Sequence, residues 1–315
     1  MHPVATSQTM ESTWSDRFSR PPEIEEYPAL VAAAYGRTDQ GRVRPANEDS
    51  FLIASPGAPW LRQEEGAPIR THAEYGTDQL FVVADGMGGH AGGAQASALA
   101  VTAVERSLIS TLHWLFALRA PEDEVDVDVL SEMCAALQRA DLRVCEEAAR
   151  SPGFSDMGTT LTVAYLHASR LYVAHAGDSR CYLLRGNKMY RLTQDHTLVH
   201  EMVQHGILES EDDAHAPFRH VVTNFVGGPR PGVRVEVHRV KVAPGDVILL
   251  CTDGLTGMLS DAQIAAVLRA HPDPREACDR LIDAANDAGG RDNVTAIVAL
   301  CAELPGPALA RPLDG

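Results

Sequence analysis

Short apolar runs separated by turn residues recur along the 315-residue chain, and three of them stand beside an aspartate. They read LFVVA directly before Asp85, VILLCT directly before Asp253, and VTAIVAL shortly after Asp292. Continuous apolar runs of this length are typical of strands that are buried on both faces. We therefore expect three carboxylates fixed at the ends of rigid, buried elements.

Further short runs predict other strands, and longer stretches with helical spacing predict helices. Ser260 with Gln263 reads as a capping box, and Pro274 after Asp273 suits a helix start. Strands in two groups with long helices between them indicate an α+β layered domain. The remaining expected strands are 31–36, 51–54, 158–166, 171–175, 181–184, 221–226 and 233–240, and the expected helices are 94–118, 129–150, 260–270 and 274–288.

Local composition predicts the domain boundaries. Residues 1–30 are largely polar, contain proline and lack periodicity, which is typical of a mobile tail. We expect a single domain over residues 31–303 and a short tail over residues 304–315.

Charge and cysteine content exclude several classes of protein. A formal net charge of −16 without a basic stretch argues against a nucleic-acid partner, whose affinity depends on clustered Lys and Arg. No apolar stretch approaches the roughly 20 residues that span a bilayer, and the N-terminus lacks a signal-peptide core. The six cysteines form no CxxC pair, which argues against zinc and fits free thiols in a reducing cytoplasm. We expect a cytoplasmic protein without a membrane partner.

A fourth place in the chain adds two more acids, the adjacent Glu48 and Asp49. Five acids from four distant places can hold two divalent cations, because such a site needs one bridging carboxylate and separate carboxylates for each ion. Hard oxygen ligands suit Mg²⁺, Ca²⁺ or Mn²⁺. We expect Asp85 to bridge the two ions. Asp253 and Asp292 would hold one of them, and the Glu48–Asp49 pair would hold the other, partly through waters.

Nearby residues supply the rest of a hydrolytic site. The Gly86 carbonyl is another expected ligand, because glycine lets the backbone approach an ion closely. Two bound cations lower the pKa of a water from about 15.7 toward about 7, which would make a metal-bridged hydroxide the nucleophile. Arg44 can hold two oxygens of a tetrahedral anion with its planar fork, although its spacing also fits a surface ion pair with Glu48. His90 could protonate the leaving alkoxide or hydrogen-bond the loop backbone instead. Together these groups describe hydrolysis of a phosphate monoester.

Three other patterns have weaker functional interpretations. GMGGHAGG looks like a dinucleotide-binding loop, but that interpretation requires a second strand soon after the helix and leaves Asp253 and Asp292 unexplained. The stretch 123–130 (DEVDVDVL) vaguely resembles a calcium loop, yet it lacks the central glycine and closing glutamate, so we expect a solvated linker. Five histidines match no zinc signature and are expected at exposed positions. They are His196, His200, His205, His215 and His220.

Eight sequence blocks resemble those of the metal-dependent serine/threonine protein phosphatases of the PPM, or type 2C, class. They occur in family order between about residues 32 and 302, and the DGMGGH and MGTT blocks are similar to the bacterial branch. The blocks are RPANEDSF, FVVADGMGGHAGG, MGTTLTVAYL, LYVAHAGDSRCYLLR, LTQDHTLV, VVTNFVGG, GDVILLCTDGLTGMLSD and GGRDNVTAIVA.

The resemblance implies a four-layer α-β-β-α sandwich, in which helices flank two packed antiparallel sheets and the metals lie in a cleft at one end. It implies Mn²⁺ or Mg²⁺ on the acids named above, Arg44 on the phosphate, and Asn293 orienting the last ligand. A weaker third ion is expected near the MGTT block, with Asp156 as the nearest candidate ligand, whereas Asp178 is expected to be structural. Residues 195–220 correspond to the family's variable flap, which touches substrate.

One position departs from the animal enzymes of that class. They carry a histidine directly after the metal-binding Asp-Gly, proposed as the general acid, and this chain has Met87 there. The general acid is therefore His90, a metal-bound water, or no protein group.

The resulting hypothesis is a monomeric enzyme that removes phosphate from phosphoserine and phosphothreonine in proteins and opposes a Hanks-type Ser/Thr kinase. One alternative is a non-catalytic relative that binds a phosphoprotein as a scaffold, which would be signalled by a lost ligand acid. Another is a phosphatase of an anti-sigma antagonist pathway, which motifs alone do not separate from the first hypothesis.

Overall fold

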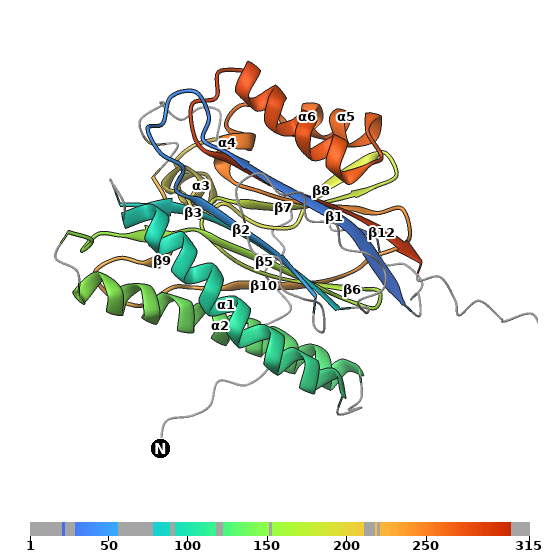
Figure 1. The fold of residues 1–315 in the computed structure, drawn as a ribbon, viewed down its shortest axis with the longest axis horizontal. Helices are drawn as coiled ribbons and strands as arrows, with labels where there is room; N and C mark the ends of the chain where they lie inside the picture. The colour runs from blue at the N-terminus through green and yellow to red at the C-terminus, as the bar shows by residue number, and fades with distance from the viewer. Residues whose placement is uncertain are drawn as a thin grey trace, which may run out of the picture.

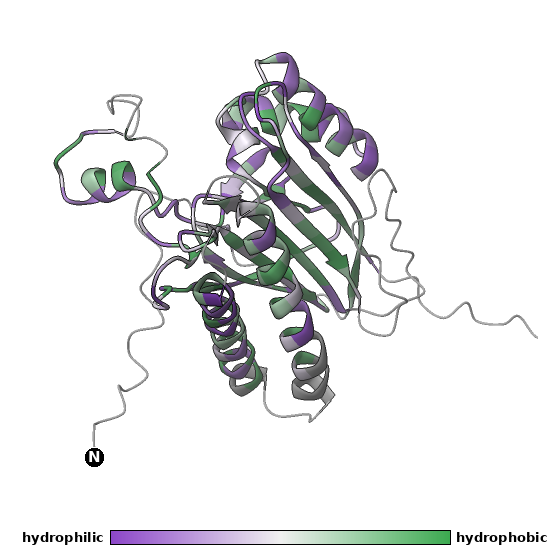
Figure 2. Ribbon diagram, turned by 60° about the vertical axis from the view of Figure 1, so that its left-hand side comes forward, coloured by the Kyte–Doolittle hydropathy of each residue, from purple (hydrophilic) through white to green (hydrophobic). Residues whose placement is uncertain are grey.

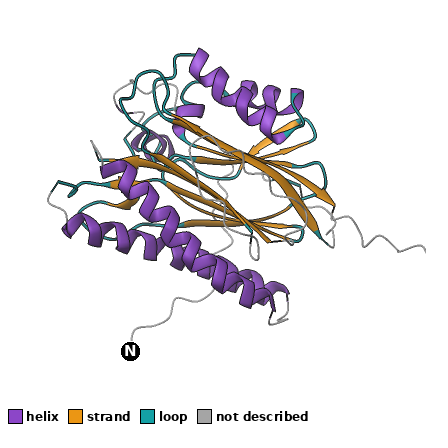
Figure 3. Cartoon of the chain, viewed as in Figure 1, coloured by secondary structure: helices purple, strands orange, loops and turns teal. Residues whose placement is uncertain are grey.

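Two antiparallel sheets lie face to face in the computed structural model, with helices on both outer sides (Figures 1 and 3). The structure describes residues 21–22, 29–55, 78–88, 92–117, 122–150, 153–210, 218 and 221–303. This arrangement confirms the expected α-β-β-α sandwich. The dinucleotide-fold interpretation of GMGGHAGG is wrong, because the strand pairings of the described residues are all antiparallel in both sheets.

The first sheet contains the two C-terminal strands that carry predicted site residues at their ends. Its strands in spatial order are β1 (Leu30–Asp39), β12 (Val294–Glu303), β11 (Val247–Cys251), β7 (Arg180–Arg185) and β8 (Lys188–Arg191). The second sheet contains the LFVVADG run. Its strands in order are β10 (Glu236–Lys241), β6 (Arg170–Ala176), β5 (Leu161–His167), β3 (Asp78–Met87), β4 (Gly158–Thr159) and β9 (Val226–Gly227), with β2 (Asp49–Ala54) paired to β3.

Two pairs of helices cover the outer faces. α1 (Gly92–Ala117) and α2 (Glu122–Arg150) lie on the second sheet, and α5 (Asp261–Ala270) and α6 (Pro274–Asp287) lie on the first (Figure 1). Two short helices, α3 (Leu198–Gln204) and α4 (Asp253–Thr256), belong to connecting segments. None of the described helices combines the length and apolar character needed to cross a membrane.

The side chains of β3 alternate between two hydrophobic cores, one on each face of the second sheet. Successive side chains of a strand point to opposite faces. Leu80 and Val82 accordingly belong to the core beneath α1 and α2, whereas Phe81 and Val83 belong to the core between the sheets. A third core lies between the first sheet and helices α4 to α6. Figure 2 shows hydrophobic residues concentrated in the strands. Burial on both faces explains why these runs lack polar positions.

The predicted helices form close to their expected boundaries, with one correction. The stretch 123–130 is not a solvated linker, because α2 begins at Glu122 and includes all of it. Within this stretch Asp126 is buried and accepts hydrogen bonds from Arg170, Tyr172 and Arg239. An acidic stretch that looks solvated therefore fastens α2 to β6 and β10.

Strands around the expected flap are shorter than predicted. Of residues 221–226, Val222 forms an isolated bridge with Thr197, and regular pairing begins at Val226. The strand expected at 233–240 is Glu236–Lys241, and β8 was not predicted. The expected tails at residues 1–30 and 304–315 lie almost entirely outside the described residues.

Candidate metal centre

Strand register brings the predicted acids to one end of the sandwich. Asp49 at the start of β2 lies directly opposite Asp85 near the end of β3. Thr252, which precedes Asp253, donates its backbone N–H to the Thr295 carbonyl, which sets the end of β11 beside the start of β12. The carboxylates are close enough to disturb one another. Burial raises the pKa of Asp85 well above its ordinary value, and Asp49 and Asp253 raise it further.

One oxygen of the Asp49 carboxylate accepts from two threonine hydroxyls, and the other has no hydrogen-bond partner. Its Oδ2 accepts from Thr252 Oγ1 at 2.9 Å and from Thr295 Oγ1 at 2.6 Å, whereas its buried Oδ1 has no hydrogen-bond partner. Burial raises the pKa of this carboxyl to about 7, although the two hydroxyls hold it down in part. A buried carboxylate oxygen without a partner is costly unless a cation is there to meet it. The Asp49 side chain therefore fits a divalent ion.

The backbone of Asp85 is fixed by the MGTT block. Thr160 Oγ1 accepts from the Asp85 N–H, and the Asp85 carbonyl accepts from the Thr160 N–H and from Thr159 Oγ1, all at 2.9 Å. A Cβ on Gly86 would lie 2.1 Å from the Gly93 carbonyl oxygen, so close approach requires glycine here. The predicted bridging residue thus stands on a rigid strand end next to closely packed main chain.

Glu48 lies over the start of α1. Its carbonyl accepts from the Gly86 N–H at 3.2 Å and from Ser97 Oγ at 2.7 Å. Its Oε2 atom would be 2.8 Å from a Cβ placed on Gly93, so the carboxylate meets the first turn of that helix. The positive end of a helix dipole is a favourable place for this negative charge.

Asn293 organises the loop before β2. Its side chain donates to the carbonyls of Gln40 and Ala46 at 2.9 and 2.8 Å and accepts from the Glu48 N–H at 2.9 Å. Its own N–H donates to Asp292 Oδ1 at 2.9 Å. Asn293 therefore connects the Asp292 carboxylate with the loop that carries the predicted arginine, a wider role than orienting one ligand.

Arg44 lies at the exposed edge of the acid cluster. Its guanidinium donates to Asp292 Oδ2 at 2.5 Å, and about half of the side chain is exposed. This hydrogen bond raises the pKa of Arg44, and the nearby Asp253 and Asp85 act in the same direction. The partner is thus a predicted metal ligand rather than Glu48, the surface partner considered from spacing.

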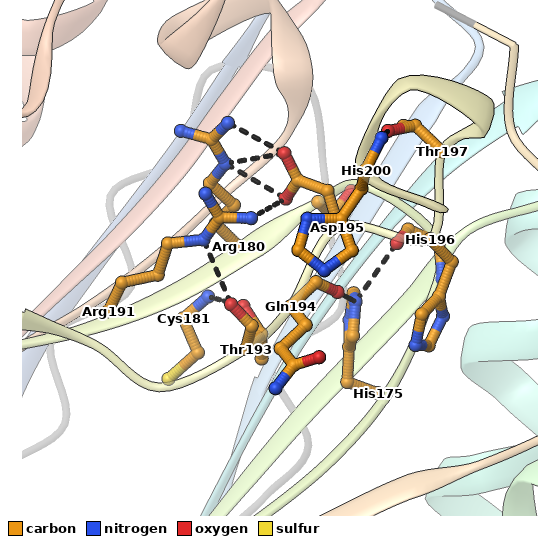
Figure 4. Close-up of polar contacts among 12 residues, drawn as sticks. His175, Arg180, Cys181, Arg191, Thr193, Gln194, Asp195, His196, Thr197 and His200 are labelled. Atoms are coloured by element: carbon orange, nitrogen blue, oxygen red, sulfur yellow. Dashed lines mark hydrogen bonds and ion pairs between the residues drawn. The ribbon is translucent and has the colours of Figure 1, made fainter. Parts of the chain in front are cut away.

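A sixth acid, Asp178, also faces the cluster. It is buried, and burial followed by the charge of Asp253 raises its pKa well above the ordinary value. Two residues later Arg180 forms a bidentate contact with Asp195, which Arg191 also contacts (Figure 4). Although burial alone would raise it, these two guanidiniums hold the pKa of Asp195 below its ordinary value. The turn after β6 and the start of the expected flap are therefore fastened together.

Other predicted residues lie differently. His90 is outside the described residues. Asp156 is exposed, and its carbonyl oxygen would be 2.9 Å from a Cβ placed on Gly88 beyond the end of β3. The expectation of exposed histidines is wrong for His196 and His200, which are half-buried and buried and make hydrogen bonds within the protein. His205 is exposed, and the other two expected positions are not described.

Among the described residues, the cluster is a set of hard oxygen donors whose negative charge is not offset by neighbouring cationic groups, because the pKa of Asp85 stays well above its ordinary value. Such a set suits Mg²⁺ or Mn²⁺ better than soft metals. The sequence reasoning missed the threonines Thr252, Thr295 and Thr160, and it assigned Asp178 to structure. A usable signal was present, because Thr252 directly precedes Asp253, Thr295 lies two residues after Asn293, and Thr160 ends the MGTT block.

Comparisons with known proteins agree with this architecture. The family model described as protein phosphatase 2C matches residues 69–296. A serine/threonine phosphatase stp from Listeria welshimeri is 32% identical over 262 residues, which cover 83% of this chain and 93% of that protein.

Two solved structures show the same fold. The Streptococcus agalactiae serine/threonine phosphatase has a TM-score of 0.70 at 28% identity and covers 87% of this chain and 100% of its own. The catalytic domain of the serine/threonine protein phosphatase PstP, solved in complex with two manganese ions, has a TM-score of 0.66 at 30% identity, with 87% and 100% covered. The chain therefore belongs to the protein phosphatase 2C family.

Proposed function

We propose that this protein hydrolyses phosphoserine and phosphothreonine monoesters in proteins with the help of two divalent cations, Mn²⁺ or Mg²⁺. The observation that carries the proposal is the convergence of Asp49, Asp85, Asp253 and Asp292 at one end of the sandwich. Family membership and the manganese-containing relative support it. The intact set of acids favours an enzyme over a non-catalytic scaffold.

The proposed division of ligands follows the strand ends. Asp85 would bridge the cations, with the Gly86 carbonyl beside it. Asp253 and Asp292 would hold one ion, and the pair Glu48 and Asp49 would hold the other; Asp156 stays a candidate for a weaker third ion. When bound, the two cations would lower the pKa of a shared water toward neutrality and so supply the nucleophile.

Arg44 is the proposed phosphate-binding residue. In the structure its guanidinium neutralises Asp292 at the exposed edge of the cluster. Cations bound to the same acids would take over that neutralisation. The planar fork would then be available to two oxygens of a phosphoryl group. The strongly acidic chain, with a formal charge of −16, makes such local positive charge necessary for an anionic substrate.

The remaining assignments are proposals of the same kind. His90 is a candidate for protonating the leaving serine or threonine oxygen, and water is the alternative. The partners would be phosphorylated proteins and a cognate Ser/Thr kinase. A monomer would suffice, because the proposed site draws its residues from one chain. The proposed location is the cytoplasm.

The direct test is activity on a phosphothreonine peptide with Mn²⁺, compared with phosphotyrosine and nucleotide substrates. Chelation should abolish hydrolysis, Mn²⁺ should restore it, and the phosphothreonine peptide should be preferred. Asp85→Asn should lower the rate at least about a hundredfold, because losing a ligand removes more than losing a supporting contact does. Asp128→Asn, an identical change at an exposed position of α2, is the matched control. Full activity of Asp85→Asn would refute the metal assignment.

A further inference from the structure

His175 and His196 hydrogen-bond to Gly177, which forms the turn directly before Asp178. The Gly177 N–H donates to His196 Nδ1 at 3.1 Å, and its carbonyl accepts from the His196 N–H at 2.7 Å. That carbonyl also contacts His175 Nε2 at 3.0 Å. Gly177 has a φ of +122°, and a Cβ there would lie 2.5 Å from Thr160 Cβ. The turn therefore has a conformation and a close approach to Thr160 that only glycine allows.

The hydrogen bonds determine the protonation of the His196 ring. A backbone N–H can only donate, so Nδ1 must be the unprotonated acceptor for Gly177. Asn224 Nδ2 also lies 2.9 Å from Nδ1. The backbone of Arg234 orients the Asn224 amide, because its carbonyl accepts from Nδ2 and its N–H donates to Oδ1. The proton of the neutral ring is then on Nε2, which faces Glu236 Oε2 at 3.6 Å. Glu236 thus favours the tautomer that the turn needs.

The group formed by His175, His196 and Glu236 is better explained as a set of hydrogen bonds that holds the turn, called the lock below, than as a metal site. The ligand atoms of His175, His196 and Glu236 lie within 4.8 Å of one another. However, His175 Nε2 is 3.0 Å from two carbonyl oxygens, those of Gly177 and Gln194, and must therefore carry a proton (Figure 4). Burial lowers the pKa of His175 to about 4, so the ring is neutral at pH 7. A protonated nitrogen offers no lone pair to a metal.

His196 also stands where the chain enters and leaves the segment around α3. The next residue, Thr197, caps α3 by accepting from the His200 N–H. The His196 carbonyl accepts from the Thr223 N–H at 2.8 Å, on the returning stretch of chain. One residue therefore contacts the start of α3, the return from this segment and the turn beside the acids.

We propose that His196 is a positioning residue that couples the order of α3 to the occupancy of the metal centre. The turn reaches the proposed ligands through Thr160, which lies against Gly177 and whose hydroxyl contacts Ser179 at 2.8 Å and accepts from the Asp85 N–H at 2.9 Å. Bound cations would fix Asp85, and with it Thr160 and the turn, whose N–H is satisfied by His196 Nδ1. Coupling of this kind is reciprocal, so order in α3 must also strengthen cation binding. The inference rests on the proposed metal binding.

The test compares two substitutions that preserve different atoms of the ring. In His196→Asn the side-chain oxygen can take the place of Nδ1, whereas in His196→Gln the polar atoms reach toward the position of Nε2. Hydrogen exchange of the α3 amides is measured in the full chain with and without Mn²⁺, and Mn²⁺ affinity is measured by calorimetry. Loss of one buried hydrogen bond corresponds to about a fivefold change in an equilibrium.

We expect Mn²⁺ to slow exchange in α3 about fivefold in the wild type and in His196→Asn, and to have no effect in His196→Gln. The Gln variant should also bind Mn²⁺ about fivefold more weakly. A wild-type-like response of His196→Gln would overturn the proposal. If that variant does not fold, ¹⁵N NMR of the wild-type ring decides, because a proton on Nδ1 contradicts the lock. Mn²⁺ binding without any response in α3 overturns the coupling alone, whereas absent Mn²⁺ binding overturns the proposed function as well.

Discussion

Replacing Thr295 by valine tests how the structure prepares Asp49 for a cation. The Thr295 hydroxyl donates to Asp49 Oδ2 at 2.6 Å, and valine keeps the shape of the side chain while removing that donor. Thr252 continues to donate to the same oxygen at 2.9 Å. The substitution therefore removes one of two hydrogen bonds that favour the ionised carboxylate.

The expected magnitude follows from the value of one such bond. A hydrogen bond to a charged group contributes about 1.5–3 kcal/mol, which corresponds to about 1–2 pKa units. The pKa of Asp49 is already raised to about 7. At pH 7 a further rise of this size leaves about 1–10% of the carboxylate ionised, so that cation affinity falls about 5–50-fold.

The effect has a characteristic pH dependence. At pH 8.5 the wild-type carboxylate is ionised and the variant regains about a quarter to three quarters of its charge, so the deficit should shrink to about fourfold or less. The assay is a Mn²⁺ titration under argon by calorimetry, with p-nitrophenyl phosphate hydrolysis as a second readout. Thr295→Ser keeps the hydroxyl and should stay within about twofold of the wild type. Equal losses at both pH values, or no loss at pH 7, would refute the reasoning.

Three further outcomes follow from the same contacts. Asp126→Asn removes a buried charged carboxylate that pairs with Arg170 and Arg239. It should lower the free energy of unfolding, measured by urea denaturation, by about 2–4 kcal/mol and leave kcat unchanged. A stability loss below measurement error would contradict this prediction. The folded-state pKa of Asp49 is above the unfolded one, so this group's contribution to the stability of the metal-free protein is present below about pH 4 and is lost as the pH rises through about 7. Mn²⁺ should therefore raise Tm more at pH 8 than at pH 5, and an equal increase would be evidence against the raised pKa. Gly177→Ala should lower the free energy of unfolding by more than about 1 kcal/mol, because its Cβ meets Thr160; an unchanged urea midpoint would exclude that clash.

Much of the fold was predictable because the elements with the strongest signals are buried on both faces. The LFVVA, VILLC and VTAIVAL runs form β3, β11 and β12, and the capping box at Ser260 and the Asp273–Pro274 start begin α5 and α6 as expected. Local patterns carry this information because burial and caps act within a few residues. Strand register adds the rest, since it places Asp49 opposite Asp85.

The predictions failed where polar residues are satisfied by distant partners. The acidic stretch around Asp126 looks solvated, but Arg170 and Arg239 come to it from β6 and β10. His196 looks like an exposed histidine, but Gly177 and Asn224 satisfy its ring. No local pattern reveals such partners, because their separation along the chain is set by the topology of the sheets.

The central claim is that acids from distant strand ends share two cations, and anomalous diffraction at the manganese edge tests it most directly. Crystals of the protein grown with Mn²⁺ should show two strong anomalous peaks that both touch Asp85, one shared with Asp49 and the other with Asp253 and Asp292. Absence of both peaks from this end of the sandwich, with manganese present in the crystal, would contradict the account.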